Sequence, residues 1–301
     1  MNYSKVINAV FNPNPQMPCT ELYKGLGSEV YRVDTPTPLV VRIAHGDQGH
    51  FKFQAELMEA IADSDELTPR IFFWEMNEKT KPIQGIQVQS YLSGSPLGHY
   101  PSPKESKAIV ESVYTIHQRL CDISGEFGLD TCATVDDVLN NYFSKIDDCP
   151  IKVAANNLLQ HKRYNELFTS ERQYLSHFDL WAKNLLIEEE GEIIKVRIID
   201  FDTVFGPKSM QPAILFTSCF LISSLMFRSE YLPLSELEKV IEHWPESLDR
   251  QDLLIMMQIF PIVIGLKAEY AFGRFPEYTQ EHHNSRIHLL MGCLNNIRKW
   301  L

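Results

Sequence analysis

Three polar residues in one short part of the sequence have the side chains that phosphoryl transfer needs. Asp179 and Asn184 stand five positions apart in the segment HFDLWAKN, and Asp200 directly follows the strand-like residues 196–199. A hairpin at residues 188–192 would bring Asp200 back beside Asn184. We therefore expect two carboxylates and one amide to meet at one end of a small sheet.

These side chains suit phosphoryl transfer, a reaction in which the protein itself forms and breaks few covalent bonds. The transferred group is highly charged, so the protein mainly holds Mg²⁺ against the phosphates and orients the attacking hydroxyl. Asp200 offers a hard oxygen ligand for Mg²⁺, and the side-chain carbonyl of Asn184 would hold the same or a second ion. Asp179 would accept or orient the proton of the acceptor hydroxyl. His177 would brace the loop rather than react.

The first third of the chain alternates strand-like and turn-like segments. One helix is predicted over residues 51–62, because its apolar residues recur along one face. A turn at residues 34–38 separates the first two of four predicted strands, which indicates a hairpin. The predicted strands are residues 29–33, 39–44, 71–74 and 86–91.

After about residue 93 the pattern becomes helical. Ile109, Val113, Ile116 and Leu120 recur at spacings of four, three and four, which places them on one helical face. Pro261 should kink or divide one of the later helices. Strand-and-loop segments are predicted inside this part at 174–179, 184–187 and 196–202. The further predicted helices are 134–148, 152–168 and several from residue 235 onward.

The two polar motifs also carry a family resemblance. HFDLWAKN and IIDFD resemble the H-x-D-x-x-x-x-N and D-x-D signatures of the aminoglycoside phosphotransferase and choline kinase superfamily. The resemblance covers about residues 20–205 and implies an α+β, bilobal protein-kinase-like fold. Its small β-rich lobe (1–92) would bind the nucleotide and end in the hinge. Its large helical lobe (93–301) would hold the catalytic loop and the acceptor site.

The resemblance also assigns a nucleotide site in the small lobe. The turn after residue 24 resembles the family's glycine-containing turn over the phosphates, and Arg42 takes the place of the strand lysine. Glu56 is the expected ion-pair partner of Arg42, with Glu59 as the alternative. The implied nucleotide contacts are Gly25, Gly27, Ser28, Arg42 and Glu56, with the hinge residues Ser90, Tyr91 and Leu92.

The expected enzyme is a Mg²⁺-dependent small-molecule kinase that transfers the γ-phosphoryl group of ATP or GTP to an alcohol. Phe178 departs from the glycine common in the antibiotic-resistance enzymes, which argues against aminoglycosides. Acidic and aromatic residues in the later helices (Glu269, Tyr270, 272–278 and Trp244) would suit a cationic or amino alcohol. The alternatives are a protein kinase and a nucleotide-binding pseudokinase scaffold.

Composition sets the remaining expectations. The 301 residues carry a net charge of −11, which counts against a nucleic-acid partner. The six cysteines form no C-x-x-C pair, so reduced thiols in the cytoplasm are expected. No secretory signal is recognisable. The apolar residues 214–227 are too few to cross a bilayer, so a buried helix and no membrane contact are expected.

Overall fold

The fold is described from a computed structural model that gives the positions of residues 19–24, 28–45, 48–62, 66–76, 85–127, 132–228, 232–274 and 279–301. The chain divides into two compact units, Met1–Ser93 and Gly94–Leu301, each of which is described by itself. The boundary expected from the sequence lies between residues 92 and 93, one position earlier.

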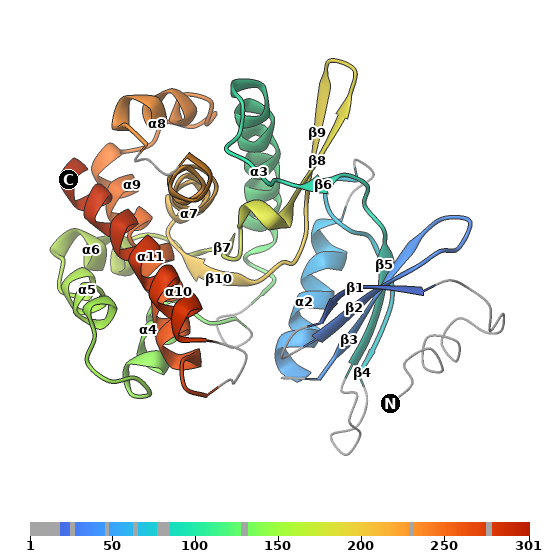
Figure 1. The fold of residues 1–301 in the computed structure, drawn as a ribbon, viewed down its shortest axis with the longest axis horizontal. Helices are drawn as coiled ribbons and strands as arrows, with labels where there is room; N and C mark the ends of the chain where they lie inside the picture. Colours follow the sequence, from blue (N-terminus) through green and yellow to red (C-terminus); the bar gives the residue numbers. More distant parts are fainter. Residues whose placement is uncertain are drawn as a thin grey trace. The chain divides into compact units, whose positions relative to one another are not determined.

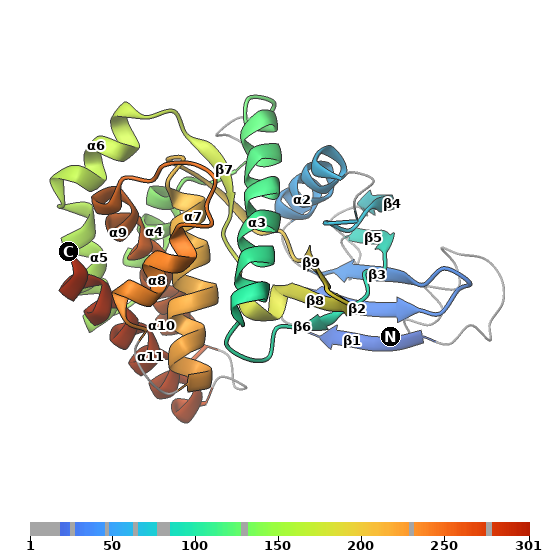
Figure 2. The same ribbon diagram turned by 90° about the horizontal axis from the view of Figure 1, so that it is seen from above.

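In its described residues, unit 1 is an antiparallel sheet with one helix (Figures 1 and 2). The helix is α2 (Gln48–Ile61), which contains most of the predicted helical segment. Every predicted strand overlaps an observed one, and the predicted hairpin is β2–β3. The strands, in the spatial order β1-β2-β3-β5-β4, are β1 (Cys19–Lys24), β2 (Ser28–Val33), β3 (Leu39–Ala44), β4 (Ile71–Met76) and β5 (Gly85–Ser90).

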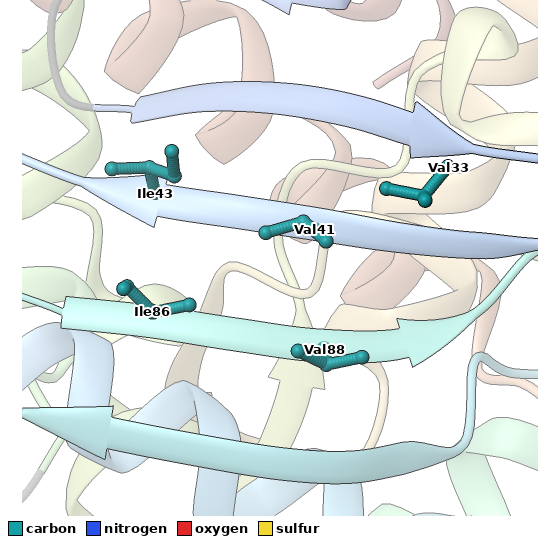
Figure 3. Packing of buried hydrophobic residues seen from close by; sticks show 5 residues of the cluster. All are labelled: Val33, Val41, Ile43, Ile86 and Val88. Carbon is teal, nitrogen blue, oxygen red and sulfur yellow. The ribbon is translucent and has the colours of Figure 1, made fainter. Parts of the chain in front are cut away.

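Helix α2 covers one face of this sheet. Arg42 on β3 donates a hydrogen bond to Gln54 on α2 (2.9 Å). A Cβ atom at Gly85 would lie only 2.6 Å from the ring of Phe51, so the glycine lets the helix approach β5 closely. Successive side chains of a strand point to opposite faces, so the apolar alternate positions face away from α2. These positions are the buried cluster Val33, Val41, Ile43, Ile86 and Val88 (Figure 3).

In the described residues, unit 2 consists of helices and two small antiparallel sheets (Figures 1 and 2). The strands are β6 (Ser95–Pro96), β7 (Tyr174–His177), β8 (Leu185–Glu190), β9 (Ile193–Ile198) and β10 (Thr203–Gly206), in the sheets β6-β8-β9 and β10-β7. The α-helices are α3 (Pro103–Ile123), α4 (Val135–Phe143), α5 (Pro150–Leu159), α6 (Lys162–Ser170), α7 (Met210–Leu215), α8 (Leu234–Ile241), α9 (Arg250–Met257), α10 (Ile259–Ala271) and α11 (Gln280–Trp300). The other helical segments are the 3₁₀-helix η1 (Ala182–Asn184) and the π-helical segments η2 (Phe216–Ile222) and η3 (Ser224–Arg228).

Two helix predictions need correction. The predicted helix at 152–168 is two helices, because His161 is extended (φ −72°, ψ 122°) and interrupts the helical hydrogen bonding between α5 and α6. The predicted helix at 134–148 ends at Phe143. Its start was well marked, since the Thr134 hydroxyl and the Asp137 carboxylate form a capping box.

Pro261 divides a long apolar helical stretch, as the sequence predicts. Helix α9 ends at Met257 and α10 begins at Ile259, so Pro261 lies in the first turn of α10. A proline has no N–H group and cannot donate to the carbonyl four residues earlier, which here is that of Met257. The hydroxyl of Thr217 donates to this carbonyl instead (3.1 Å). The carbonyl left unpaired by the proline therefore accepts a hydrogen bond from a side chain of η2.

The apolar segment after β10 is continuous with α7. It changes from an α-helix to the π-helical segments η2 and η3, and the whole stretch is Met210–Arg228. This stretch and Arg250–Ala271 are long and apolar enough to span a membrane by length and composition alone. In each, 83% of the most apolar 18 residues are buried inside the protein, as in a core helix.

His117 on α3 gives a pH dependence to the stability of unit 2. Its ring is fully buried, 5.6 Å from that of Trp244, and burial lowers its pKa to about 4. Glu246, Lys208, Cys121 and Tyr114 are the titratable groups around it. As the pH falls from 6.5 to 4, the unfolded chain takes up a proton that the folded ring does not. The free energy of unfolding therefore falls over this range, by of order 3 kcal/mol from this group.

We expect His117→Leu to remove this part of the acid destabilisation. The measurement is urea unfolding of both proteins at pH 7 and pH 4.5. The wild type should lose more stability between the two pH values than the variant. His243→Leu, at an exposed histidine, should behave as the wild type. An equal loss in His117→Leu and the wild type would contradict the expectation.

Candidate active site

Backbone hydrogen bonds hold the predicted catalytic loop against the Asp200 segment. β7 and β10 pair antiparallel with His177 opposite Thr203, and the Phe178 N–H donates to the carbonyl of Asp202 (2.6 Å). The Ile199 N–H donates to the carbonyl of Asn184 (3.0 Å). The loop after β7 and the turn after β9 are thus joined at both ends, as the hairpin in the sequence predicts.

Asn184 is oriented by the aspartate five positions before it. Its amide nitrogen donates to the backbone carbonyl of Asp179 (2.7 Å) and to the Asp179 carboxylate (3.0 Å). Since these bonds use the N–H groups, the amide oxygen of Asn184 remains available as an acceptor or a metal ligand. The structure therefore brings Asp179 and Asn184 together in the way that the sequence predicts.

Asp200 is exposed and lies in the left-handed region of backbone conformation (φ 59°). The Asp202 N–H donates to the Asp200 carbonyl (3.0 Å), which closes a tight turn over Phe201. Aspartate and asparagine tolerate this conformation better than most residues, and such strain is typical of functional sites. The turn presents two carboxylates while Phe201 is buried.

The surroundings of Asp179 and His177 disfavour the charged forms of both side chains. Burial raises the pKa of the Asp179 carboxyl, and the negative charge of Asp200 raises it further. Lys183 and His177 act in the opposite direction on the same pKa. Burial lowers the pKa of His177, which favours the neutral ring.

His177 is positioned as a structural member of the loop. Its Nε2 lies 3.3 Å from the carbonyl of Ile199, and its ring stacks on Phe201 with the centroids 4.5 Å apart. Gln211 on α7 brackets the residue, accepting from the His177 N–H (2.7 Å) and donating to its carbonyl (3.4 Å). These contacts support the bracing role expected from the sequence.

We expect Gln211→Leu to lower both stability and activity. The leucine would leave the buried N–H and C=O of His177 unpaired, at a cost of roughly 2–4 kcal/mol in the free energy of unfolding. Urea unfolding measures this cost, and kcat measures the effect on the loop. Gln118→Leu is the control, because Gln118 donates a single hydrogen bond to Glu246 away from the loop. Unchanged stability of Gln211→Leu would contradict the bracketing role.

The π-helical segment η2 supports the loop from the other side. The Ser218 hydroxyl lies 2.6 Å from the Leu180 carbonyl and 2.7 Å from that of Ile214, so it can donate to one of them at a time. The thiol of Cys219 donates to the same Leu180 carbonyl (3.1 Å). Two neighbouring side chains therefore reach the residue that directly follows Asp179. π-Helical turns occur frequently at functional sites.

The donor set fits Mg²⁺ bound together with a substrate. Among the described residues, no group of three or more His, Cys, Asp and Glu side chains is arranged to hold a metal. Mg²⁺ in phosphotransferases takes one or two carboxylates and completes its shell with phosphate oxygens and water. The Asp200 carboxylate and the amide oxygen of Asn184, whose N–H groups are used by Asp179, are such a set.

Residues 19–205 match the family model described as the phosphotransferase enzyme family, APH. The chain belongs to the APH phosphotransferase family. The resemblance stated from the two motifs is thus confirmed, and so is the expected small-molecule kinase. A comparison with curated protein sequences gave no match.

Solved structures similar to this APH phosphotransferase confirm its protein-kinase-like fold. APH(2″)-IIIa in complex with GDP and kanamycin has a TM-score of 0.69 at 14% identity, over 98% of each chain. An ethanolamine kinase of Plasmodium vivax has a TM-score of 0.67 at 14% identity, over 99% of this chain and 89% of the other. A choline/ethanolamine kinase family protein of Mesorhizobium loti has a TM-score of 0.64 at 12% identity, over 98% and 95%.

The nucleotide residues predicted in unit 1 are placed in part. Gly25 and Gly27 lie outside the described residues, and Ser28 begins β2. Ser90 ends β5 and its hydroxyl accepts from the Arg70 N–H (2.9 Å). The Tyr91 N–H donates to the carbonyl of Pro38 (3.3 Å) and Leu92 is buried. Their contacts with a nucleotide stay predictions.

The predicted partner of Arg42 was wrong. Glu56 forms an ion pair with Lys52 one turn earlier on α2 (3.6 Å), and Glu59 accepts from the indole N–H of Trp74 (3.1 Å). Arg42 donates instead to Gln54, which is buried. Gln54 lies on the side of α2 that faces the sheet, and Glu56 is turned about 200° away from it.

Sequence reasoning missed two residues near Asp202. Lys267 on α10 forms an ion pair with the Asp202 carboxylate (3.5 Å) and lies over the Phe178 ring, 5.8 Å from its centroid. Tyr142 on α4 is close enough for both charges to act on its pKa, which burial raises. The signal for Lys267 was its position, because it is a lone cation directly after the apolar residues 259–266.

The acceptor candidates in the later helices have other contacts. Trp244 is buried against Tyr114 and Phe216, as a core residue. The Glu269 carboxylate lies 3.4 Å from Nε2 of His283 on α11. Tyr270 packs edge-on against Tyr142, with the centroids 5.5 Å apart. Residues 275–278 of the expected aromatic cluster lie outside the described residues.

Proposed function

We propose that this APH phosphotransferase uses Mg²⁺ to move the γ-phosphoryl group of ATP or GTP to a hydroxyl of a small molecule. The observation that carries the proposal is the orientation of Asn184 by Asp179, which leaves an amide oxygen free beside an exposed Asp200. Bound there, Mg²⁺ would neutralise phosphate charge as the phosphoryl group leaves the nucleotide.

The proposed site residues then have distinct tasks. Asp179 accepts the proton of the attacking hydroxyl, for which its raised pKa brings it nearer to the operating pH. His177 holds the loop in place through its contacts with Ile199 and Phe201. Arg42 binds phosphate oxygens, with Gln54 holding one of its nitrogens.

Named ligands of similar structures support a nucleotide and an alcohol as the two substrates. The solved neighbours include complexes with GDP and kanamycin and with AMP-PNP and hygromycin B. The chain after β10 supports a small acceptor over a protein. Only residues 207–209 separate β10 from α7, which leaves no length for the long activation segment of a protein kinase.

We also propose that the enzyme works in the cytoplasm as a protein without nucleic-acid or membrane partners. All six cysteines are free, as expected in a reducing compartment.

Nucleotide binding and turnover test the proposed function. We expect AMP-PNP to raise the melting temperature only when Mg²⁺ is present. We expect transfer from ATP or GTP to at least one alcohol in a panel of choline, ethanolamine, thiamine, homoserine, sugars, aminoglycosides and macrolides, or in a small-molecule extract. If the nucleotide does not stabilise the protein and no transfer occurs in any of these assays, the proposed function is refuted.

A further inference from the structure

Positive side chains gather around the catalytic residues of unit 2, although the chain as a whole carries a net charge of −11. Lys183 lies within the catalytic loop and is exposed. Lys267 contacts Asp202 at 3.5 Å. Arg286 on α11 lies over the ring of Trp181, 5.7 Å from its centroid. The N–H of Trp181 in turn donates to the carbonyl of Asp179 (2.9 Å), so Arg286 is two contacts from the catalytic aspartate.

A second pair of cations lies just beyond the C-terminal ends of α4 and α10. Lys145 and Arg274 both lie over the ring of Tyr270, at 5.7 Å and 4.3 Å from its centroid. Tyr270 contacts Tyr142, which is near Lys267 and Asp202. Arg274 also donates to the backbone carbonyls of Tyr270 (2.7 Å) and Lys145 (2.9 Å), so it joins the two helix ends.

The carboxylates near these cations already have other roles. Asp179 and Asp200 serve the reaction in the proposed function, and Asp202 is paired with Lys267. The Glu269 carboxylate lies 3.4 Å from Nε2 of His283, whose ring stacks on Phe272. In the part of the chain that the structure describes, Lys145, Arg274 and Arg286 have no carboxylate within ion-pair distance. Among the described contacts, a cationic acceptor would thus meet several positive charges beside the catalytic loop.

We propose that the acceptor is an alcohol that also carries a carboxylate or phosphate group, and that Arg286 and Lys267 bind this anionic group beside the catalytic loop. The inference rests on the proposed function and names its substrate class. The aromatic rings under Arg286 and Lys267 hold their charged groups in place, which favours recognition of an anion. Lys145 adds positive potential farther from Asp179 and draws the anion toward the site.

This acceptor class differs from the ligands named for the similar structures. Kanamycin, hygromycin B and ethanolamine all carry amines that are protonated at neutral pH. Free carboxylates at an acceptor site favour the binding of such amines. Here Glu269, the carboxylate that the sequence suggested for this purpose, is bound by His283. An anionic acceptor satisfies the unpaired cations, whereas an amine would be repelled by them.

The test separates possible acceptors by charge before any compound is identified. A small-molecule cell extract is divided by ion exchange into anionic, neutral and cationic fractions. Each fraction is incubated with the full-length enzyme, Mg²⁺ and either ATP or GTP labelled at the γ-phosphate. We expect labelled product from the anionic fraction, absent with Asp179→Asn. Treating that fraction with phosphatase beforehand removes the activity if the group is a phosphate and spares it if it is a carboxylate.

Matched variants then test whether Arg286 and Lys267 bind the anionic group of the acceptor. Arg286→Gln and Lys267→Gln should each lower kcat/KM for the anionic fraction at least about tenfold, mainly through KM. Arg298→Gln, an exposed arginine on the same helix α11, should leave it unchanged. Binding of AMP-PNP should be the same in all three, which excludes misfolding as the cause.

The outcomes that overturn the inference differ from those that overturn the proposed function. Label from the cationic or neutral fraction only, or equal loss in Arg298→Gln and Arg286→Gln, would overturn the anionic acceptor and leave a kinase. If no fraction gives labelled product and AMP-PNP with Mg²⁺ does not stabilise the protein, the proposed function as a kinase is itself refuted. Stabilisation without label from the anionic fraction also counts against the anionic acceptor.

Discussion

Asp179→Asn should lower kcat by roughly 10²- to 10⁴-fold, the range expected for loss of a general base. The substitution keeps the size of the side chain. It also keeps the hydrogen bond from the Asn184 amide to the Asp179 backbone carbonyl, so the loop should hold its shape. We expect Mg²⁺ and AMP-PNP to bind the variant as they bind the wild type. Single-turnover transfer from ATP and thermal stabilisation by AMP-PNP measure the two properties separately.

The same substitution should not weaken the fold. Burial and Asp200 raise the pKa of Asp179, so the folded protein binds this proton more tightly than the unfolded chain. The stabilisation from Asp179 is therefore present at low pH and is lost as the pH rises through the raised pKa. At neutral pH the carboxylate opposes folding. Metal-free Asp179→Asn should then melt at the same temperature as the wild type or higher at pH 7. Wild-type kcat, or a lower melting temperature, would contradict this account.

Asp200→Asn should lower kcat by at least about 10²-fold and abolish the Mg²⁺-dependent stabilisation by AMP-PNP. The physical reason is loss of the one exposed carboxylate in the predicted metal site. Asparagine suits the comparison better than alanine because it tolerates the left-handed conformation at this position (φ 59°). Melting curves with AMP-PNP over a Mg²⁺ titration measure the effect.

A nearby carboxylate supplies the control for this second prediction. Glu189 on β8 is exposed in the same small sheet and faces no predicted ligand. Glu189→Gln removes the same charge from another exposed position. Its stabilisation by AMP-PNP should depend on the Mg²⁺ concentration as that of the wild type does. Mg²⁺-dependent stabilisation that survives in Asp200→Asn would mean that Asp200 is no metal ligand.

The catalytic residues of unit 2 could be predicted because short segments position them. Asp179 and Asn184 are joined through a five-residue loop, and one hairpin brings Asp200 to them. Neither step depends on distant parts of the chain. The division at Pro261 was predictable for a similar reason, since a proline changes its own turn whatever surrounds it.

Contacts that depend on helical phase or on distant packing could not be read in the same way. The prediction that Arg42 pairs with Glu56 took account of charge but not of which side of the helix residue 56 occupies. The buried Gln54 meets the arginine because the sheet-facing side of α2 passes through position 54. Lys267 reaches Asp202 across 65 positions of sequence, which no local pattern encodes. The break at His161 was missed because no proline or glycine marks it.

The π-helical segment η2 has a consequence for how this protein can change over time. Its side chains are nearly all buried and mostly apolar, so many of them could be exchanged for others of similar size. Its number of residues is far less free. Removing a residue that precedes Ser218 would turn the following side chains by about a quarter of a turn and take Ser218 and Cys219 away from the Leu180 carbonyl. Homologous enzymes that keep this support should therefore vary in the composition of the segment and conserve its length.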